Sequence, residues 1–230
     1  MIETPAAPVR PLVTYTLIGG CALVFLLGPA SGLDPRYGTG ERLRQAQHAY
    51  FEHWGVVPYD LWHGAGLAAL SPLTALFVHA NWLHLLGNML FLYVFGAMAE
   101  ERMGRLRFAL FYLVTGYLAL SGYAAAHAGS TQSLVGASGA ISGVLGAFLW
   151  LFPRARVTSL FPFLLFLPLR FPAWLVLIFW FALQWLAVGQ TRDRPGVAYL
   201  AHLVGFTLGF LYAWTRFGGA SRRRRAPSLE

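Results

Sequence analysis

The 230-residue sequence has no lysine, a single cysteine and few charged residues of either sign. All 17 of its basic residues are arginine, and charged residues make up 11% of the chain, whereas hydrophobic residues make up 57%. Because Cys21 has no second cysteine to pair with, no disulfide can form within the chain. So few charges exclude an ordinary soluble domain, and the mean hydropathy of +0.56 is typical of a protein that crosses the membrane several times.

Acidic residues are missing from the places where two classes of membrane protease need them. All nine Asp and Glu residues lie outside the interiors of the apolar runs, and no His-Glu-x-x-His motif occurs. A metal-dependent membrane protease would contain that motif, and an aspartyl protease would place two carboxylates inside its spans. A serine paired with a histidine is the nucleophilic arrangement that remains. We therefore expect no metal and no other cofactor.

Six apolar runs are present that can form membrane spans. They cover residues 12–31, 82–98, 108–126, 138–152, 173–188 and 197–217. The sequence predicts an all-α polytopic membrane protein with a six-helix transmembrane domain over residues 1–217 and a basic tail over residues 218–230. The run that begins at Ser138 has only about 15 residues, too few to cross a hydrocarbon core of roughly 30 Å. Its N-terminus should therefore start below one membrane surface, in a cavity.

Two of the connections between these runs have unusual compositions. Residues 32–71 interleave charged and aromatic side chains, which suits the membrane–water interface, and we expect a half-immersed loop with short helices there. Residues 161–172 are apolar but contain Pro162, Pro168 and Pro172, so we expect a bent connection.

The positions of the arginines predict the orientation of the chain. With six spans, both termini lie on one side, together with Arg10, Arg102, Arg105, Arg107, Arg154, Arg156, Arg216 and the arginines that follow. This basic bias predicts cytoplasmic termini and places Ser138 near the outer surface. Arginines in short groups between apolar runs are topology signals, so the net charge of +8 does not indicate nucleic-acid binding. The use of arginine alone and the lack of targeting extensions predict a bacterial inner membrane.

Ser138 lies among small residues, in the run Gly136-Ala137-Ser138-Gly139-Ala140-Ile141-Ser142-Gly143. Small neighbours leave a hydroxyl accessible and leave backbone N–H groups free to stabilise an oxyanion, and a nucleophilic serine needs both. Runs of Gly, Ala and Ser are also ordinary helix-packing faces in membranes. This stretch alone therefore does not decide between packing and chemistry.

A second set of small residues accompanies His202. One helix face is shared by Ala198, His202, Gly205, Gly209 and Ala213. The run that begins at Ser138 offers a matching face in Gly139, Gly143 and Gly146. Pressing the two faces together would bring Ser138 and His202 within reach of each other. We therefore predict a Ser–His dyad rather than a histidine bonded to a neighbouring carbonyl.

A third group of polar residues lies in the second apolar run. His84 and Asn88 are four residues apart and share a helix face, so an imidazole and an amide could both donate to an oxyanion. His79 is expected in the turn before that helix. The alternative is that these groups form polar contacts between helices, which suits Asn81.

The three groups together resemble the rhomboid family of intramembrane serine proteases, in the expected order along the chain. Gly136-Ala137-Ser138-Gly139 resembles the G-x-S-G nucleophile motif of the family. The pattern of His, His and Asn in its second helix is matched by His79, His84 and Asn88, and its final-helix motif by Ala201-His202-x-x-Gly205-x-x-x-Gly209. The resemblance extends from the second span to the last.

The resemblance implies a rhomboid-like six-helix core in which Ser138 is the nucleophile and His202 is the general base and then the general acid. It implies an oxyanion site formed by His84, Asn88 and the backbone N–H of Ser138. The supporting residues that it implies are His79, Gly136, Gly139, Ser142, Gly205 and Gly209. The implied reaction is cleavage of transmembrane segments of membrane proteins.

The sequence departs from the family pattern at two places. The Trp-Arg pair of the first loop is not evident, and Asp60-Leu61-Trp62-His63 stands in that region. Many bacterial members carry a tyrosine four residues after the nucleophile, where its ring supports the catalytic histidine. Ser142 occupies that position here and cannot stack, so the support of His202 is left open.

Two other functions compete with the protease. A catalytically inactive rhomboid-like protein that binds transmembrane clients would lack the nucleophile, the histidine or an oxyanion donor. A small transporter would place polar residues along a path through the bilayer, whereas the polar groups here gather near one side. We therefore expect a serine endopeptidase whose partners are transmembrane substrates and the lipid bilayer, with no nucleic acid and no metal.

Overall fold

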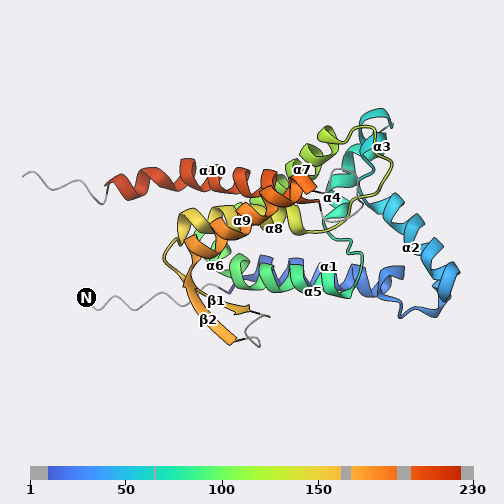
Figure 1. Ribbon diagram of the computed structural model, residues 1–230, viewed down its shortest axis with the longest axis horizontal. Coiled ribbons are helices and arrows are strands. Elements are labelled where there is room, and N and C mark those ends of the chain that lie inside the picture. The colour runs from blue at the N-terminus through green and yellow to red at the C-terminus, as the bar shows by residue number, and fades with distance from the viewer. Residues whose placement is uncertain (1–9, 65, 162–166, 191–197, 224–230) are drawn as a thin grey trace, which may run out of the picture.

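The computed structural model describes residues 10–64, 66–161, 167–190 and 198–223, which are mostly helical. The helices are α1 (Leu12–Leu27), α2 (Gly40–Trp54), α3 (Pro58–His63), α4 (Ser71–Ala75), α5 (Trp82–Phe91), α6 (Ala97–Met103), α7 (Arg105–Ala126), α8 (Ser138–Leu151), α9 (Ala173–Gln190) and α10 (Tyr199–Arg223). Short helical turns are η1 (Pro29–Ser31), η2 (Pro35–Tyr37), η3 (Gly66–Leu70) and the π-helical η4 (Leu92–Gly96), which joins α5 to α6. The strands are β1 (Arg156–Phe161) and β2 (Leu167–Pro172). Figure 1 shows the elements in chain order by colour.

Each of the six predicted runs contains a long helix or the continuous rod α5–η4–α6. Among the described residues, two helices are long and apolar enough to cross a membrane by length and composition, Trp82–Met103 and Arg105–Ala126. Four further apolar helices are shorter, namely Leu12–Leu27, Gly66–Ala75, Ser138–Leu151 and Ala173–Gly189. The count of six spans therefore stays a prediction.

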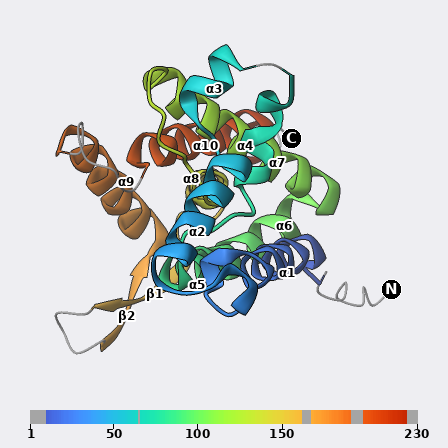
Figure 2. The ribbon, with the colours of Figure 1, turned by 90° about the vertical axis from the view of Figure 1, so that its right-hand side faces the viewer.

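Helix α8 forms the centre of the bundle. In Figure 2 it is seen with α5, α7, α9 and α10 around it, and it contacts each of them. Every residue of α8 from Gly139 to Phe148 is buried. A helix surrounded on all sides needs small residues where neighbours approach and apolar residues elsewhere, which is the composition of this segment.

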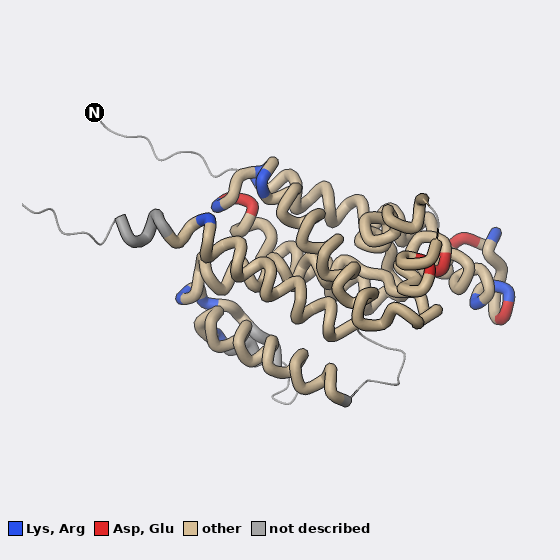
Figure 3. Tube along the Cα trace, turned by 90° about the horizontal axis from the view of Figure 1, so that it is seen from above, with Lys and Arg blue, Asp and Glu red and all other residues tan. Residues whose placement is uncertain are grey.

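The outward faces of the surrounding helices are also apolar. Large exposed hydrophobic side chains include Leu83, Leu86 and Leu90 on α5, Leu106, Leu110 and Val114 on α7, and Phe179, Trp185 and Leu186 on α9. Apolar outward faces on several neighbouring helices suit contact with lipid. Figure 3 shows that the charged residues gather at the two ends of the bundle instead.

The described chain begins and finishes at the same end of the bundle. The start of α1 and the end of α10 both lie at the left of Figure 1, and α2 and α3 lie at the opposite end. Helix α10 runs to Arg223, so it extends past the predicted end of the last span at residue 217. The predicted loop over residues 192–195 lies outside the described residues.

The predicted loop over residues 32–71 contains the expected short helices and one longer helix. Its main element is the 15-residue helix α2. At η2 the Arg36 side chain pairs with Asp34 at 2.6 Å, and this contact lowers the pKa of the half-buried Asp34 carboxyl. After α2, Val56 exchanges two backbone hydrogen bonds of 2.8 Å with Leu134. This exchange fixes the first loop against the segment that leads to Ser138.

The expectation of a bent connection over residues 161–172 is wrong at both ends of that stretch. β1 and β2 form a two-stranded antiparallel sheet in which Arg156 pairs with Pro172 and Phe161 pairs with Leu167. Both strands are edge strands, so a proline can turn its nitrogen away from the partner without removing a ladder hydrogen bond. The fold is therefore helical with one added hairpin, and residues 162–166 lie outside the described part.

One acidic residue, Glu100, is buried inside the protein, near the end of the rod formed by α5, η4 and α6. Glu100 lies within the rod Trp82–Met103, and its side chain is only 1% exposed. Its Oε1 accepts a hydrogen bond of 3.0 Å from the Val13 N–H, and its Oε2 accepts bonds of 2.7 and 2.8 Å from the N–H and Oγ1 of Thr14. These amides belong to the first turn of α1, which has no intrahelical acceptors for them. Glu100 therefore attaches α1 to α6.

Candidate active site

The approach to Ser138 is set by the glycine two residues before it. Gly136 has φ of +128°, a conformation that L side chains rarely adopt, and its N–H donates to the Ala75 carbonyl at 2.9 Å. Helix α8 then begins at Ser138. The N–H groups of its first turn have no intrahelical carbonyl to bond, so they are available to a ligand beside Ser138.

Two predicted glycine faces bring α8 and α10 into contact, and these two helices share the most extensive interface among the described helices. A Cβ on Gly205 would overlap the Gly139 carbonyl, and a Cβ on Gly209 would overlap the Gly143 carbonyl. On Gly139 itself, a Cβ would lie 3.0 Å from the Ala119 side chain. Glycine at these positions allows the two backbones to touch.

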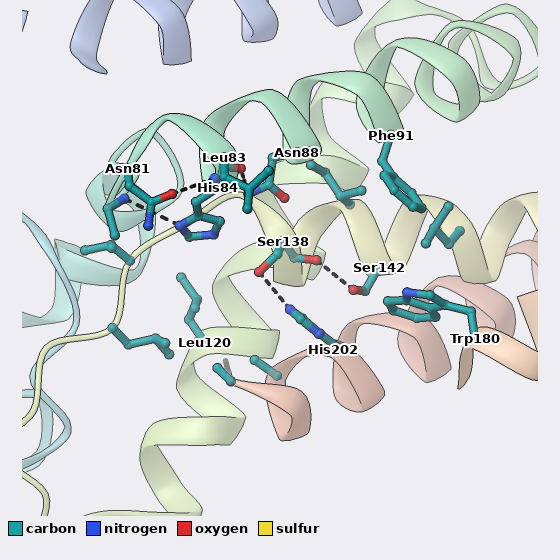
Figure 4. A pocket seen from close by; sticks show the side chains of 18 of the residues that line it. Asn81, Leu83, His84, Asn88, Phe91, Leu120, Ser138, Ser142, Trp180 and His202 are labelled. Carbon is teal, nitrogen blue, oxygen red and sulfur yellow. Dashed lines mark hydrogen bonds between the residues drawn. The ribbon is translucent and has the colours of Figure 1, made fainter. Parts of the chain in front are cut away.

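This contact places Ser138 and His202 side by side. Ser138 Oγ and His202 Nε2 are 2.8 Å apart and form a hydrogen bond, drawn as a dashed line in Figure 4. His202 is 8% exposed, and Ser138 is half-buried. A hydroxyl that donates to an imidazole nitrogen at this distance is the arrangement in which a histidine can take the serine proton.

His84 and Asn88 lie across the pocket from this pair, as Figure 4 shows. The Ala80 N–H points to His84 Nδ1 at 3.4 Å, so in the neutral ring Nε2 carries the hydrogen. His84 packs against Gly136, where a Cβ would come within 2.8 Å of Nε2. Asn88 donates one amide hydrogen to the His84 carbonyl at 3.0 Å and keeps its second for another acceptor. Both residues can therefore donate into the pocket.

His79 lies behind His84, outside the lining of the pocket. It is 1% exposed, its Nδ1 is 3.3 Å from the Phe77 carbonyl, and its ring stands 5.2 Å from that of His84. Asn81 is the N-cap of α5, where its side chain accepts from the His84 N–H at 2.9 Å. Asn81 is therefore a helix cap rather than a contact between helices, and His79 contacts the His84 ring through its own ring.

Ser142 makes no hydrogen bond to His202. Its Oγ donates to the Ser138 carbonyl one turn earlier, at 2.7 Å. The aromatic ring beside His202 comes instead from Trp180 on α9, with ring centroids 5.9 Å apart and ring planes 32° apart. Support for the histidine thus comes from a neighbouring helix rather than from the turn after the nucleophile.

The sequence analysis missed Gln184, also on α9. Its Oε1 lies 2.8 Å from His202 Nδ1, on the side of the ring opposite Ser138. One signal was present, since Gln184 is the only polar side chain in an otherwise apolar run from Ala173 to Gly189. A lone amide in an apolar helix needs a hydrogen-bond partner inside the protein.

These residues surround a pocket of about 610 Å³. Its polar lining includes Asn81, His84, Asn88, Ser133, Ser138, Ser142 and His202, and its apolar walls include Leu83, Phe91, Leu120 and Trp180. No Asp, Glu or Arg is among the described residues that line it. Across the described part of the chain, no three His, Cys, Asp or Glu side chains gather in a way that could hold a metal ion. The pocket therefore offers hydroxyl, imidazole and amide groups to a ligand.

Comparison with known proteins assigns the chain to a family. The family model for the Rhomboid domain matches residues 68–219, a region that contains Ser138, His202, His84 and Asn88. The chain belongs to the rhomboid family. As a rhomboid-family member it is an integral membrane protein, in agreement with its apolar outer faces.

Three curated relatives show the extent of the similarity. Rhomboid protein 1, mitochondrial, of Saccharomyces cerevisiae is 34% identical over 149 residues, which cover 63% of this chain and 41% of the yeast protein. RHOMBOID-like protein 6, mitochondrial, of Arabidopsis thaliana is 29% identical over 167 residues, covering 65% of this chain and 48% of that protein. RHOMBOID-like protein 1 of the same plant is 38% identical over 139 residues, which cover 60% of this chain and 32% of that protein.

The matches cover less than half the length of each of these relatives. The relatives come from a yeast and a plant, and two of them are named as mitochondrial. The comparisons therefore support an integral membrane protein and do not support the predicted bacterial inner membrane.

Proposed function

We propose that this rhomboid-family chain is an intramembrane serine endopeptidase that hydrolyses peptide bonds in transmembrane segments of membrane proteins. The observation that carries the proposal is the 2.8 Å hydrogen bond between Ser138 Oγ and His202 Nε2, at the wall of a pocket that His84 and Asn88 also line. A nucleophile, a base and oxyanion donors are the three parts that acyl transfer needs.

In the acylation step, Ser138 Oγ attacks the carbonyl carbon of the scissile peptide bond, and its proton passes to His202 Nε2. The carbonyl oxygen becomes an oxyanion, which accepts hydrogen bonds from His84, Asn88 and the Ser138 backbone N–H. His202 then gives the proton to the departing amide nitrogen, and the C–N bond breaks. The N-terminal part of the substrate stays attached to Ser138 as an ester.

In the deacylation step, a water molecule attacks the ester carbon and gives one proton to His202 Nε2. The bond between that carbon and Ser138 Oγ breaks, and the proton returns to the serine oxygen. The N-terminal product leaves with a new carboxyl group, and both side chains regain their starting states. The same imidazole is therefore the base and then the acid in each half of the reaction.

The proposed substrate class rests on the family and on the expected position of Ser138 below a membrane surface. The backbone of a transmembrane helix is shielded by its own hydrogen bonds, so a peptide bond must leave the helix before Ser138 can reach it. Glycine and proline weaken the helix locally, which lowers the free energy of that unwinding. We therefore expect cleavage beside small or helix-breaking residues of the substrate.

Cleavage of a purified transmembrane substrate in proteoliposomes tests the proposal. The substrate should carry a Gly-Ala segment within its span, and the products are identified by mass. The wild type is expected to cleave it, and Ser138→Ala is expected to show no cleavage while its thermal unfolding is unchanged. Ser130→Ala is the matched control because Ser130 is not part of the pocket lining, and it should cleave at the wild-type rate.

Two results would contradict the proposal. One is cleavage by Ser138→Ala at the wild-type rate, which would remove Ser138 from the reaction. The other is a folded wild type that binds the substrate without cleaving it, which would favour an inactive rhomboid-like protein that holds transmembrane clients. A substrate without the Gly-Ala segment, offered in parallel, checks the expected preference.

A further inference from the structure

The side of His202 that faces away from Ser138 contacts an uncharged amide. Gln184 on α9 places its Oε1 2.8 Å from His202 Nδ1, and Ser138 Oγ lies 2.8 Å from Nε2. The ring is therefore held at both nitrogens by side chains from two different helices. Gln184 itself is half-buried.

These two contacts determine which nitrogen carries the hydrogen. In a neutral imidazole one nitrogen is a donor and the other an acceptor. An amide oxygen can only accept, so Nδ1 must carry the hydrogen and Nε2 must be the acceptor. That tautomer lets Ser138 donate its hydroxyl hydrogen to Nε2, as a serine about to be deprotonated must.

We propose that Gln184 is a positioning residue that keeps His202 in the tautomer able to accept the Ser138 proton. The proposal deepens the proposed protease function and rests on it. The chain would then contain a neutral counterpart of the buried carboxylate that fixes the histidine in soluble serine proteases. Trp180, one turn earlier on α9, packs against the same ring and limits its rotation.

Among the described residues around His202, the hydrogen bond found at Nδ1 is the one to Gln184. His84 faces it from α5 across the pocket, Tyr199 from α10 has its ring centroid 6.2 Å away, and Trp180 presents an aromatic face. No acidic or basic side chain is among the described residues of this lining. Among the described residues, the hydrogen bond at Nδ1 therefore comes from one amide oxygen of α9.

The test compares three variants of the full-length protein in detergent micelles. Gln184→Leu removes the acceptor at nearly constant volume, and Gln184→Glu keeps an oxygen at the same position. Leu183→Ala is the matched control, since its exposed side chain on the same helix is outside the pocket lining. Thermal unfolding of each variant confirms that it is folded.

The first readout is nitrogen-15 NMR of the histidine ring, with the His202 signals assigned by their loss in His202→Ala. Wild type, Gln184→Glu and Leu183→Ala are expected to hold the hydrogen on Nδ1. Gln184→Leu is expected to move a large part of the population to Nε2–H. A purely structural role for Gln184 would lower stability without changing the tautomer.

The second readout is the rate at which a fluorophosphonate probe labels Ser138. Loss of one hydrogen bond of ordinary strength predicts about a tenfold slower labelling in Gln184→Leu. Leu183→Ala is expected to stay within about twofold of wild type, which is less than the effect of one such bond. Gln184→Glu keeps an acceptor oxygen, so it is expected to be labelled faster than Gln184→Leu.

The inference is overturned if wild-type His202 carries its hydrogen on Nε2, or if Gln184→Leu keeps both the Nδ1–H tautomer and the wild-type labelling rate. A folded wild type that the probe does not label would contradict the proposed function instead. The NMR measurement of the tautomer does not require an active enzyme. A failure of this inference can therefore be distinguished from a failure of the proposed protease function.

Discussion

Gly136 determines how close the His84 ring lies to Ser138. A Cβ at this position would meet His84 Cε1 at 2.7 Å, and φ of +128° disfavours any L side chain. We expect Gly136→Ala to push His84 away from the oxyanion position and to slow probe labelling by about 100-fold, the usual effect of losing one such donor. The strained backbone should also lower the free energy of unfolding by about 1–2 kcal/mol.

Gly129→Ala is the control for that substitution. Gly129 lies in the same connection between α7 and α8, has no atom within 4 Å of an added Cβ and has no positive φ. The Gly129→Ala variant should be labelled by the probe at the wild-type rate. Equal labelling rates for the two variants, with both folded, would show that the contact between Gly136 and His84 has no part in catalysis.

Single residues were predictable from the sequence where a motif spacing marked them. Ser138 and His202 were placed together by two glycine faces, and His84 and Asn88 by their four-residue spacing. Gln184 was not found because one polar residue in an apolar helix shows no spacing relative to the others. Its role appears only when the packing of α9 against α10 brings it to the far side of the imidazole.

The interface between α8 and α10 depends on backbone contact. A Cβ on Gly209 would overlap the Gly143 carbonyl, so the two backbones are in direct contact there. We expect Gly209→Ala to lower the free energy of unfolding by about 1–3 kcal/mol, as overpacking does in other cores. Chemical denaturation in mixed micelles measures the change.

Gly19→Ala is the matched control on α1. An added Cβ there has no atom within 4 Å, so the substitution should be neutral or should stabilise the helix by about 0.5–1 kcal/mol. The expected effects of the two substitutions differ in sign. Stabilisation by Gly209→Ala would contradict the backbone contact between α8 and α10.

Glu100 holds α1 against the rod formed by α5, η4 and α6. Both of its oxygens accept hydrogen bonds from the first turn of α1, at 2.7 to 3.0 Å. In Glu100→Gln an amide donor replaces one oxygen and faces other donors, so we expect a loss of about 1–3 kcal/mol. Glu101→Gln, at the next and exposed position, should change the unfolding free energy by less than about 0.5 kcal/mol. Equal effects of the two would show that this attachment does not stabilise the bundle.

Helices were more predictable than the other elements. Long apolar runs located the six segments, and the predicted first residues 12, 82, 138 and 173 match those of the helices, whereas the predicted last residues 31, 98 and 217 became 27, 103 and 223. The pairing of β1 with β2 was missed because prolines in an apolar stretch also suit a bent chain. Only the hydrogen bonds between the two strands distinguish a sheet from a bent connection. The burial of Glu100 was not predicted because its partners, Val13 and Thr14, are remote in sequence.

The orientation of the whole molecule is a prediction from the arginines. We expect Arg154, beyond the C-terminal end of α8, to face the cytoplasm, and α2, beside the Ser138 end, to face the opposite side. Single-cysteine variants Arg154→Cys and Gln45→Cys, in a Cys21→Ala background, test this because both positions are exposed. A membrane-impermeant maleimide added to intact cells should label only Gln45→Cys. Labelling of Arg154→Cys alone would invert the orientation.

The most direct test of the account as a whole is to locate a covalent adduct on the protein. Wild type and His202→Ala are treated with a fluorophosphonate in native membranes, digested, and analysed by peptide mass spectrometry. The account predicts an adduct on Ser138 in the wild type and at least about 1,000-fold slower modification without the His202 imidazole. A folded wild type with Ser138 unmodified, or labelling of Ser138 that does not depend on His202, would contradict it.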